Sequence, residues 1–252
     1  MKGMIFAAGV GSRLKPWTDC HPKALVEVGE KPVIGHVIDR MTDIGIGHII
    51  VNVHHFADQI AEYLRSEYRN VHIDISDETA LLLDTGGGLR KALPLIGNEP
   101  VLIHNADILC SVSLDDMIVS HDRQRCDATL LVQPRKTSRY FLFERDRLRG
   151  WTDLRNGAVR PGELTDAARC EMLAFGGIHI ISPQIYGAIR DYAPDNTPFS
   201  ITDFYIDRCG LLDIEAYRLP EGRAWFDVGK PETLEQARDY FKGNITSKIY
   251  EQ

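Results

Sequence analysis

The 252-residue chain has little of what marks secreted, membrane-spanning or nucleic-acid-binding proteins. Its five cysteines are odd in number and form no Cys-x-x-Cys pair, which argues against a disulfide framework and against a structural zinc site. No apolar run approaches the length of a membrane span, and glycine interrupts the opening MKGMIFAAG too early for a signal peptide. Basic residues are outnumbered 29 to 36, which argues against a polyanion-binding surface. We therefore expect a cytoplasmic protein that binds neither membranes nor nucleic acid.

The composition is that of a globular protein with a sizeable core. Hydrophobic residues make up 44% of the chain and charged residues 26%, which excludes disordered and fibrous classes. The length allows one large α/β domain or two small ones. The sequence contains no repeat, linker or low-complexity tract, so we expect a single domain over residues 1–252 with a lid-like insertion at about 135–173. The sequence does not specify an oligomeric state.

Apolar segments of strand length alternate with amphipathic segments of helix length in the first half of the chain. This order predicts an α/β fold with a Rossmann-like mixed, mainly parallel sheet flanked by helices. Short charged segments between 135 and 173 predict a small antiparallel insertion carried on that sheet. Strands are expected at 4–8, 48–54, 71–76, 100–107, 128–134 and 173–182, and helices at 33–45, 56–68, 87–96, from Ser113, and after the 225–229 segment.

The stretch AAGVGSRLKPWTDCHPKAL, residues 7–25, follows the first predicted strand as phosphate-binding loops do. It is not a dinucleotide fingerprint, because Leu14 stands where the third glycine is required, and Lys23 lacks the flanking residues of a P-loop. Gly9 and Gly11 would let the backbone approach a phosphate and point N–H groups at it. Arg13 and Lys23 would add a planar and a compact positive charge suited to a polyphosphate.

This loop resembles the signature of the sugar-1-phosphate nucleotidyltransferases, in which G-x-G-[ST]-R, a proline and a later Pro-Lys follow the first strand. The matching residues are Gly9, Gly11, Ser12, Arg13, Pro16, Pro22 and Lys23. The resemblance implies a glycosyltransferase-A-like nucleotidyltransferase fold whose partners are an NTP and a sugar 1-phosphate. It also implies that Arg13 stabilises the pyrophosphate leaving group, that Lys23 contacts the reacting phosphates, and that Ala8, Gly9, Gly11 and Ser12 bind the nucleotide.

Two aspartates stand at the ends of apolar strands, Asp107 in IHNAD and Asp227 in WFDVG. The family carries a metal-binding aspartate at each place, although Ala106 here replaces the usual glycine. The resemblance therefore implies Mg²⁺ held by Asp107 and Asp227, with Asp107 also contacting the nucleotide. A sugar 1-phosphate has a second pKa of about 6 and is largely dianionic at neutral pH, so catalysis needs cations and positioning rather than a base.

A second glycine-rich segment, ETALLLDTGGGLRKAL at 78–93, resembles the family segment that closes over the base. Its Asp-Thr-Gly-Gly-Gly run is most similar to that of the N-acetylmuramate-1-phosphate uridylyltransferases of cell-wall recycling. The resemblance implies that Glu78, Thr85, Gly86 and Gly87 frame the nucleoside. It favours UTP over GTP, with mannose- or heptose-1-phosphate guanylyltransferase as the alternative.

The sugar side of the sequence carries weaker signals. The FGGI stretch resembles the family's backbone contact to sugar hydroxyls, which implies such a contact at Gly177. The family's Glu-Lys-Pro element, whose lysine holds the sugar phosphate, is not recognisable. Lys136, Arg139 and Arg155 are candidates for that charge, and we take Arg139 as the sugar-phosphate-binding residue.

Three other functions compete with this interpretation. A cytidylyltransferase acting on a non-sugar phosphate such as phosphocholine would use a related loop. A glycosyltransferase with a similar sheet would need a D-x-D motif where this chain has Asn-Ala-Asp. A non-catalytic nucleotide-sugar sensor would be expected to have lost Arg13, Lys23 or one of the two aspartates, all of which are present.

Overall fold

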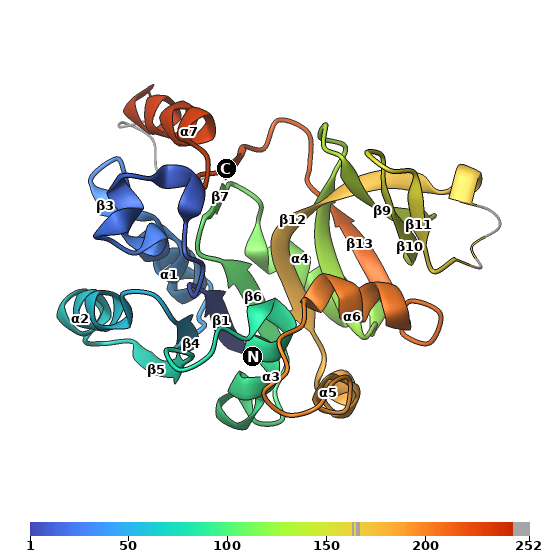
Figure 1. The fold of residues 1–252 in the computed structure, drawn as a ribbon, viewed down its shortest axis with the longest axis horizontal. Coiled ribbons are helices and arrows are strands. Elements are labelled where there is room, and N and C mark those ends of the chain that lie inside the picture. Colours follow the sequence, from blue (N-terminus) through green and yellow to red (C-terminus); the bar gives the residue numbers. More distant parts are fainter. Residues whose placement is uncertain (163, 165–166, 244–252) are drawn as a thin grey trace.

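A computed structural model describes residues 1–162, 164 and 167–243, and a ten-stranded mixed sheet forms the centre of this part of the chain (Figure 1). Its strands are β1 (Lys2–Phe6), β4 (His48–Val53), β5 (His72–Asp77), β6 (Val101–Asn105), β8 (Ala128–Gln133), β9 (Arg139–Glu144), β10 (Arg147–Asp153), β11 (Ala158–Arg160), β12 (Glu171–Ile181) and β13 (Ile214–Arg218). The strand order is β5-β4-β1-β6-β12-β8-β13-β10-β11, and β9 pairs with both β10 and β12.

The first half of the sheet is parallel and follows the predicted strand and helix alternation. Strands β6, β1, β4 and β5 run in one direction. Helices α1 (Val33–Asp43), α2 (Ala57–Glu67) and α3 (Asp84–Ile96) connect them. Parallel strands need such crossover connections, so the expected βαβαβ half is confirmed.

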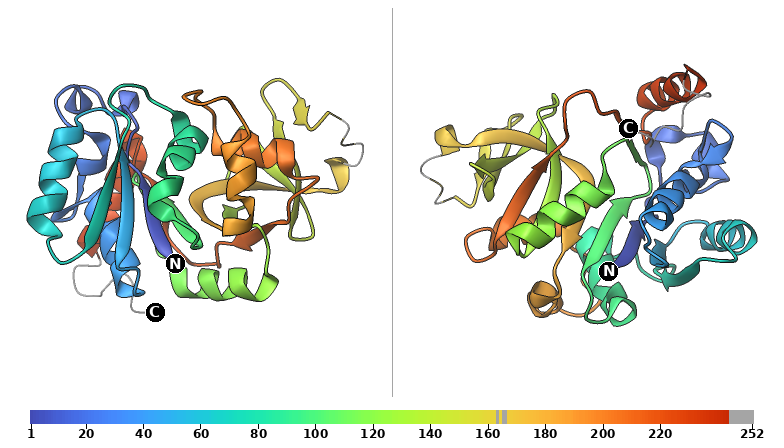
Figure 2. Two further views of the ribbon diagram at one scale, coloured as in Figure 1. Left: turned by 90° about the horizontal axis from the view of Figure 1, so that it is seen from below. Right: turned by 180° about the vertical axis from the view of Figure 1, so that it is seen from behind.

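Both faces of the sheet are covered by helices, which explains why its central strands are apolar throughout. Met4 of β1 packs in one core with residues of α3, α5 (Tyr186–Arg190) and α6 (Ile201–Arg208). Its neighbour Ile5 points to the other core, which contains residues of α1, α2 and α4 (Leu114–Gln124). Figure 2 shows the helices on the two sides of the sheet. The expected α/β sheet flanked by helices is thus confirmed.

The second half of the sheet contains more antiparallel pairing than the sequence indicated. The long strand β12 runs antiparallel to β6, β8 and β9, and so joins the two halves. Strands β9, β10 and β11, inside the 135–173 segment, extend the sheet at its edge, as the expected antiparallel insertion would. The sequence analysis did not predict α6 or β13, because neither has a clear hydrophobic period.

The last part of the described chain returns to the first. Strand β14 (Trp225–Asp227) pairs with β7 (Ile108–Cys110), which follows β6 directly. Helix α7 (Pro231–Gly243) packs beside the short hairpin of β2 (Glu27–Val28) and β3 (Lys31–Pro32). A third apolar cluster, which includes Leu14, Val228 and Leu234, holds the glycine-rich loop against this returning segment.

Helix α4 begins as the sequence predicts, since Ser113 caps it by accepting a hydrogen bond from Asp116 N at 3.1 Å. Among the helices that the structure describes, none combines the length and the apolar composition that a membrane crossing requires.

Candidate active site

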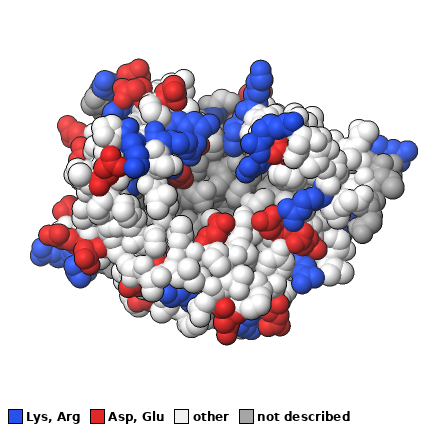
Figure 3. All heavy atoms as spheres, viewed as in Figure 1, with Lys and Arg blue, Asp and Glu red and all other residues white. Residues whose placement is uncertain are grey.

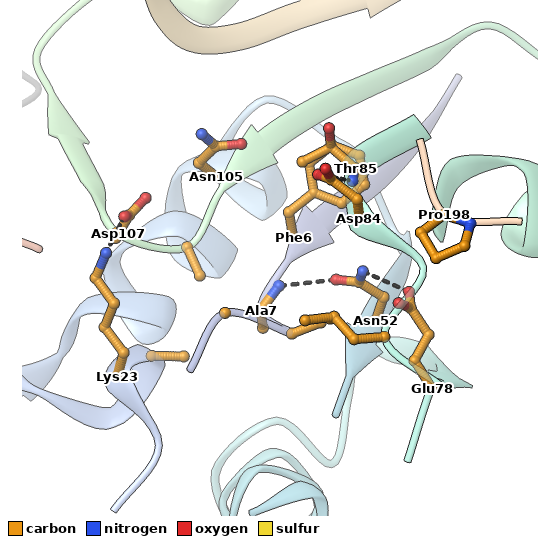
Figure 4. Close-up of a pocket in the computed structure, with 15 residues that line it drawn as sticks. Phe6, Ala7, Lys23, Asn52, Glu78, Asp84, Thr85, Asn105, Asp107 and Pro198 are labelled. Carbon is orange, nitrogen blue, oxygen red and sulfur yellow. Dashed lines mark hydrogen bonds and ion pairs between the residues drawn. The ribbon is translucent and has the colours of Figure 1, made fainter. Parts of the chain in front are cut away.

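A cavity of about 430 Å³ opens at the carboxyl ends of β1, β4 and β6, where open α/β sheets bind ligands (Figure 4). Six of the residues expected at the site line it: Ala8, Gly9, Lys23, Glu78, Thr85 and Asp107. The remaining wall is mostly apolar, with a few amides and carboxylates. Such a mixture of apolar surface and few polar groups is typical of small-molecule sites.

The glycine-rich loop is packed tightly against the segment that carries Lys23. Gly11 has a φ of 66°, and a Cβ there would lie 2.9 Å from Lys23 Cβ and 2.9 Å from Thr18 Cγ2. Thr18 Oγ1 donates a hydrogen bond to Gly11 O at 2.9 Å. By contrast, a Cβ at Gly9 would have no neighbour within 4 Å, so the backbone there is open to a ligand. Glycine at position 11 therefore allows the positive φ and the close packing against Lys23, and glycine at position 9 leaves space for a ligand next to the backbone.

Four charged side chains predicted from separate parts of the sequence meet beside this loop. Lys23 forms an ion pair with Asp107 (Figure 4), and Arg13 Nη1 lies 3.8 Å from Asp227 Oδ2. The two aspartates are neighbours because Asp227 pairs with Ile108 in the β14–β7 ladder. The same ladder is extended by a hydrogen bond of 2.9 Å from the amide that follows Asp227 to Asp107 O.

Gly229 makes room for this arrangement. A Cβ at Gly229 would overlap Lys23 Nζ and would lie 2.9 Å from Asp227 Oδ1. Its amide donates to Asp227 Oδ1 at 3.0 Å and so fixes the carboxylate. Glycine at this position of the WFDVG motif thus leaves Lys23 in place, because the Cβ of any other residue would collide with its Nζ.

The donor set of this cluster fits a divalent cation. Asp107 and Asp227 offer two carboxylates whose side chains are 24% and 22% exposed, and each is already balanced by one cation. Mg²⁺ binds one or two protein carboxylates and completes its shell with phosphate oxygens and water. The residues present are therefore suitable for Mg²⁺ together with a triphosphate.

A buried hydrogen-bond chain forms one wall of the cavity. Asn52 Oδ1 accepts from Ala7 N at 2.8 Å, and Asn52 Nδ2 donates to Glu78 Oε1 at 2.7 Å (Figure 4). The other oxygen of Glu78 accepts from Leu83 N at 2.9 Å. Glu78 is fully buried, so its carboxylate joins the glycine-rich loop, β4 and the start of α3.

All three glycines of the second motif lie in helix α3, including Gly86, which was expected to precede the helix. The sequence analysis placed the helix start at residue 87, but α3 already begins at Asp84. The amides of Gly86 and Gly87 donate to Phe199 O at 2.8 and 3.1 Å, and a Cβ at Gly86 would overlap the Phe199 ring. These glycines let the segment before α6 pack against α3. The lining of the cavity includes Thr85 but neither Gly86 nor Gly87.

A second cavity of about 650 Å³ lies beside the first and shares Asp84 with it. Arg139 lines it, with its Nε 3.6 Å from Asp153 Oδ2. Arg155 binds the same carboxylate, and its guanidinium holds the pKa of Asp153 well below the usual range. Arg139 is therefore the better placed of these two arginines to meet a ligand.

Arg135 is a candidate that the sequence analysis missed. It lines the second cavity, its guanidinium carbon lies 4.6 Å from the Trp225 ring centroid, and Nη2 donates to Phe175 O at 3.3 Å. Its Nε is buried without a hydrogen-bond partner, and no ion pair of the described residues includes it. Burial lowers the pKa of Arg135, and the nearby charge of Asp227 acts in the opposite direction. A half-buried guanidinium with spare donors suits an anionic ligand.

Gly177 lies where β12 bulges away from its regular pairing with β8. Its φ is 76°, and a Cβ there would lie 2.9 Å from Asn105 Nδ2 and 3.0 Å from Ile108 Cγ1. Asn105 lines the first cavity, so Gly177 packs against the wall of that cavity, although Gly177 is not among the residues that line it. Figure 3 shows Lys and Arg side chains on both sides of the hollow in this face.

Comparison with known proteins shows the family to which the chain belongs. The sequence model of the family described as Nucleotidyl transferase matches residues 2–160. The chain is 34% identical over 242 residues to the N-acetylmuramate alpha-1-phosphate uridylyltransferase of Caulobacter vibrioides, covering 91% of this chain and 92% of the relative. It is 42% identical over 114 residues to the protein of the same name from Neisseria meningitidis serogroup B, covering 44% of this chain and 49% of the relative.

Solved structures with the same fold share little sequence with the chain. A putative glucose-1-phosphate thymidylyltransferase from Bacillus anthracis superposes with a TM-score of 0.83 at 18% identity, over 99% of this chain and 98% of the other. A UDP-glucose pyrophosphorylase complexed with UDP-glucose gives a TM-score of 0.76 at 19% identity, over 97% and 99%. The family match covers more than half of the chain and a full-length relative supports it, so the chain belongs to the nucleotidyl transferase family.

Proposed function

We propose that this nucleotidyltransferase transfers UMP from UTP to a sugar 1-phosphate, giving a UDP-sugar and pyrophosphate, with N-acetylmuramate 1-phosphate as the favoured acceptor. The observation that carries the proposal is the meeting of four charged side chains, Arg13, Lys23, Asp107 and Asp227, of which Lys23 and Asp107 line the first cavity. The name of the full-length Caulobacter relative supports the choice of base and acceptor. We place the reaction in the cytoplasm, as the sequence led us to expect.

The proposed reaction needs no protein base. A phosphate oxygen of the acceptor forms a bond to the α-phosphorus of UTP, while the bond from that phosphorus to the β-phosphate oxygen breaks and pyrophosphate leaves. The acceptor phosphate has a second pKa of about 6 and attacks as the dianion.

The protein's part is to hold anions together and to stabilise the charge of the leaving group. Arg13 would bind the departing pyrophosphate, and Lys23 would contact the α-phosphate. Asp107 and Asp227 would hold Mg²⁺, which when bound neutralises charge on the phosphates. The backbone of Ala8, Gly9, Gly11 and Ser12 would bind the triphosphate from the open side of the loop.

The nucleoside would occupy the 430 Å³ cavity. Thr85 lines this cavity at the start of α3, and Glu78 fixes the wall behind it through its two buried hydrogen bonds. We propose that Gly86 and Gly87 act here indirectly, by allowing α3 to pack close to Phe199. Their amides are already bonded to that residue.

The acceptor would enter from the 650 Å³ cavity. We assign its phosphate to Arg135, whose guanidinium has a buried donor without a partner and lies near Asp227. Arg139 lines the same cavity and would bind a second acidic or polar group of the sugar. Gly177, which packs against Asn105 in the wall of the first cavity, would contact sugar hydroxyls through its backbone.

A pyrophosphate-release assay over four NTPs and a panel of phosphorylated acceptors tests the substrate assignment. We expect the highest kcat/KM with UTP and N-acetylmuramate 1-phosphate. Highest activity with GTP and mannose 1-phosphate would favour the guanylyltransferase function. We include this pair because a relative from Dictyostelium discoideum, 25% identical to the chain, is named a mannose-1-phosphate guanylyltransferase catalytic subunit. Activity only with CTP and phosphocholine would contradict a sugar substrate, and no release with any pair would contradict the proposal.

Two variants test the residue roles in the same assay. Arg13→Ala should lower kcat by about 10²–10³-fold, the range seen when one donor to a developing anion is removed, while the unfolding temperature changes little. Arg135→Met should raise the KM for the sugar phosphate more than the KM for UTP. Arg149→Ala is the matched control, because Arg149 is exposed on the same insertion and pairs with Glu144 away from both cavities. Equal effects of Arg135→Met and Arg149→Ala would contradict the assignment of Arg135.

A further inference from the structure

Two histidines and an aspartate lie together at the edge of the sheet opposite the cavity. His48 and His72 are the first residues of β4 and β5, and they pair directly in the parallel register. Asp74 lies two residues after His72, so its side chain projects from the same face of the sheet. One ligand atom from each of the three side chains can be chosen so that all lie within 4.8 Å of one another. Within the described part of the chain, no other three His, Cys, Asp or Glu side chains meet in this way.

The distances between the ligand atoms are close to those between neighbouring ligand atoms around a bound metal ion. Asp74 Oδ2 lies 2.8 Å from His48 Nε2, and Asp74 Oδ1 lies 3.7 Å from His72 Nε2. In a tetrahedral zinc site with bonds of about 2.0–2.1 Å, neighbouring ligand atoms are about 3.3 Å apart. The two observed distances lie on either side of this value, and each differs from it by about 0.5 Å. A small adjustment would therefore form the site.

The histidine that has to move is free to do so. The two imidazole rings are stacked, with centroids 3.9 Å apart and planes inclined by 11°, so their lone pairs do not yet converge. The His48 side chain is 22% exposed and bonded to Asp74, whereas that of His72 is 64% exposed. His72 is therefore the residue that we expect to turn so that its nitrogen faces the other two ligands.

We propose that His48, His72 and Asp74 form a binding site for a divalent transition metal, with zinc as the expected ion. Two imidazoles and one carboxylate suit zinc, copper or nickel, whereas magnesium and calcium prefer oxygen ligands. Three protein ligands leave a fourth position for water. The site is separate from the nucleotide cavity, which lies at the other end of the same strands, about 17 Å away at about 3.3 Å per residue.

The position of the cluster gives the metal a structural role. Strand β5 is the edge of the sheet and pairs only with β4 among the described strands. A metal bound by His48, His72 and Asp74 would join these two strands where they begin. Glu78, which fixes the wall of the nucleotide cavity, follows directly after β5. The metal would hold the strand from which Glu78 extends.

The proposal is tested by isothermal titration calorimetry, in which Zn²⁺ alone is added to the metal-free, full-length protein near neutral pH. We expect one equivalent to bind. Since loss of even an outer partner costs about 10–100-fold in metal affinity, His72→Asn and Asp74→Asn should each weaken binding by about tenfold or more. His55→Asn is the control, because His55 is an exposed histidine outside the cluster, and it should bind as the unaltered protein does.

A second measurement separates this site from other zinc ligands. The exposed thiol of Cys20 is the obvious competitor, so Cys20→Ser is titrated in parallel and should retain the site. Zn²⁺ should also raise the unfolding temperature of the unaltered protein and of His55→Asn, but not of His72→Asn. Equal Zn²⁺ affinity in His72→Asn and the unaltered protein, loss of binding in Cys20→Ser, or no binding at all would overturn the proposal.

Discussion

Replacement of Asn52 by alanine should destabilise the protein substantially. Asn52 is 2% exposed and makes two hydrogen bonds, one from Ala7 N at 2.8 Å and one to the buried Glu78 carboxylate at 2.7 Å. A neutral hydrogen bond contributes about 1 kcal/mol and one to a charged group about 1.5–3 kcal/mol. Asn52→Ala should therefore lower the free energy of unfolding by about 2.5–4 kcal/mol, or about 5–15 °C in unfolding temperature.

Urea unfolding monitored by circular dichroism measures this loss of stability. A second substitution at residue 52 and a control at an exposed asparagine test its cause. Asn52→Asp should be less stable still, because it removes the donor to Glu78 and sets a second carboxylate against it. Asn98→Ala, at an exposed asparagine after α3, should stay within about 0.5 kcal/mol of the unaltered protein. A loss below about 1 kcal/mol in Asn52→Ala, or an Asn52→Asp variant as stable as the unaltered protein, would refute the reasoning, because the buried chain would then contribute little.

Three other perturbations have defined outcomes. Gly229→Ala should reduce kcat with little change in unfolding temperature, because the new Cβ displaces Lys23 Nζ. Steady-state kinetics and a melting curve test this, and a fall in unfolding temperature that accounts for the lost activity would contradict it. Gly177→Ala, at a φ of 76°, should lower stability by about 1–2 kcal/mol in urea unfolding, and an unchanged midpoint would be inconsistent with the strain. Burial lowers the pKa of His104 and of His179 to about 3 in the folded protein. Below pH 6.5, the pKa of an ordinary histidine, only the unfolded chain binds protons at these two residues, so the free energy of unfolding decreases as the pH is lowered. Between pH 7 and pH 5 the loss should be about 2 kcal/mol per histidine, and a His104→Asn/His179→Asn variant with the same pH slope would argue against it.

The sequence predicts those parts of the site whose signals are local. The glycine-rich loop, Arg13 and Lys23 lie within one stretch after the first strand, and the two aspartates each end an apolar run. A parallel sheet brings the carboxyl ends of its strands to one edge, so strand prediction alone places Asp107 near the loop. Asp227 was expected there from the family resemblance, and the β14–β7 pairing explains its position.

The parts that could not be predicted depend on contacts between distant segments. Arg135 is a candidate because Trp225 and Phe175 hold its side chain over the second cavity, and no pattern around residue 135 shows those partners. Its position directly after the predicted strand 128–134 was the one available signal. Gly86 was expected to lie before the helix, which was predicted to begin at Gly87, but α3 already includes Gly86, where close packing against Phe199 outweighs the low helix preference of glycine.

The pairing of β14 with β7 also has a bearing on synthesis of the protein. Asp107 and Lys23 are translated in the first half of the chain, whereas Asp227 arrives about 120 residues after Asp107 and closes the cluster by joining a strand already made. A nascent chain that has not yet reached Asp227 would thus have only one of the two carboxylates that we propose for the metal. A chain that ends before residue 225 would also lack Val228 and Leu234, which pack in one cluster with Leu14 of the glycine-rich loop, so this loop would lose part of its support.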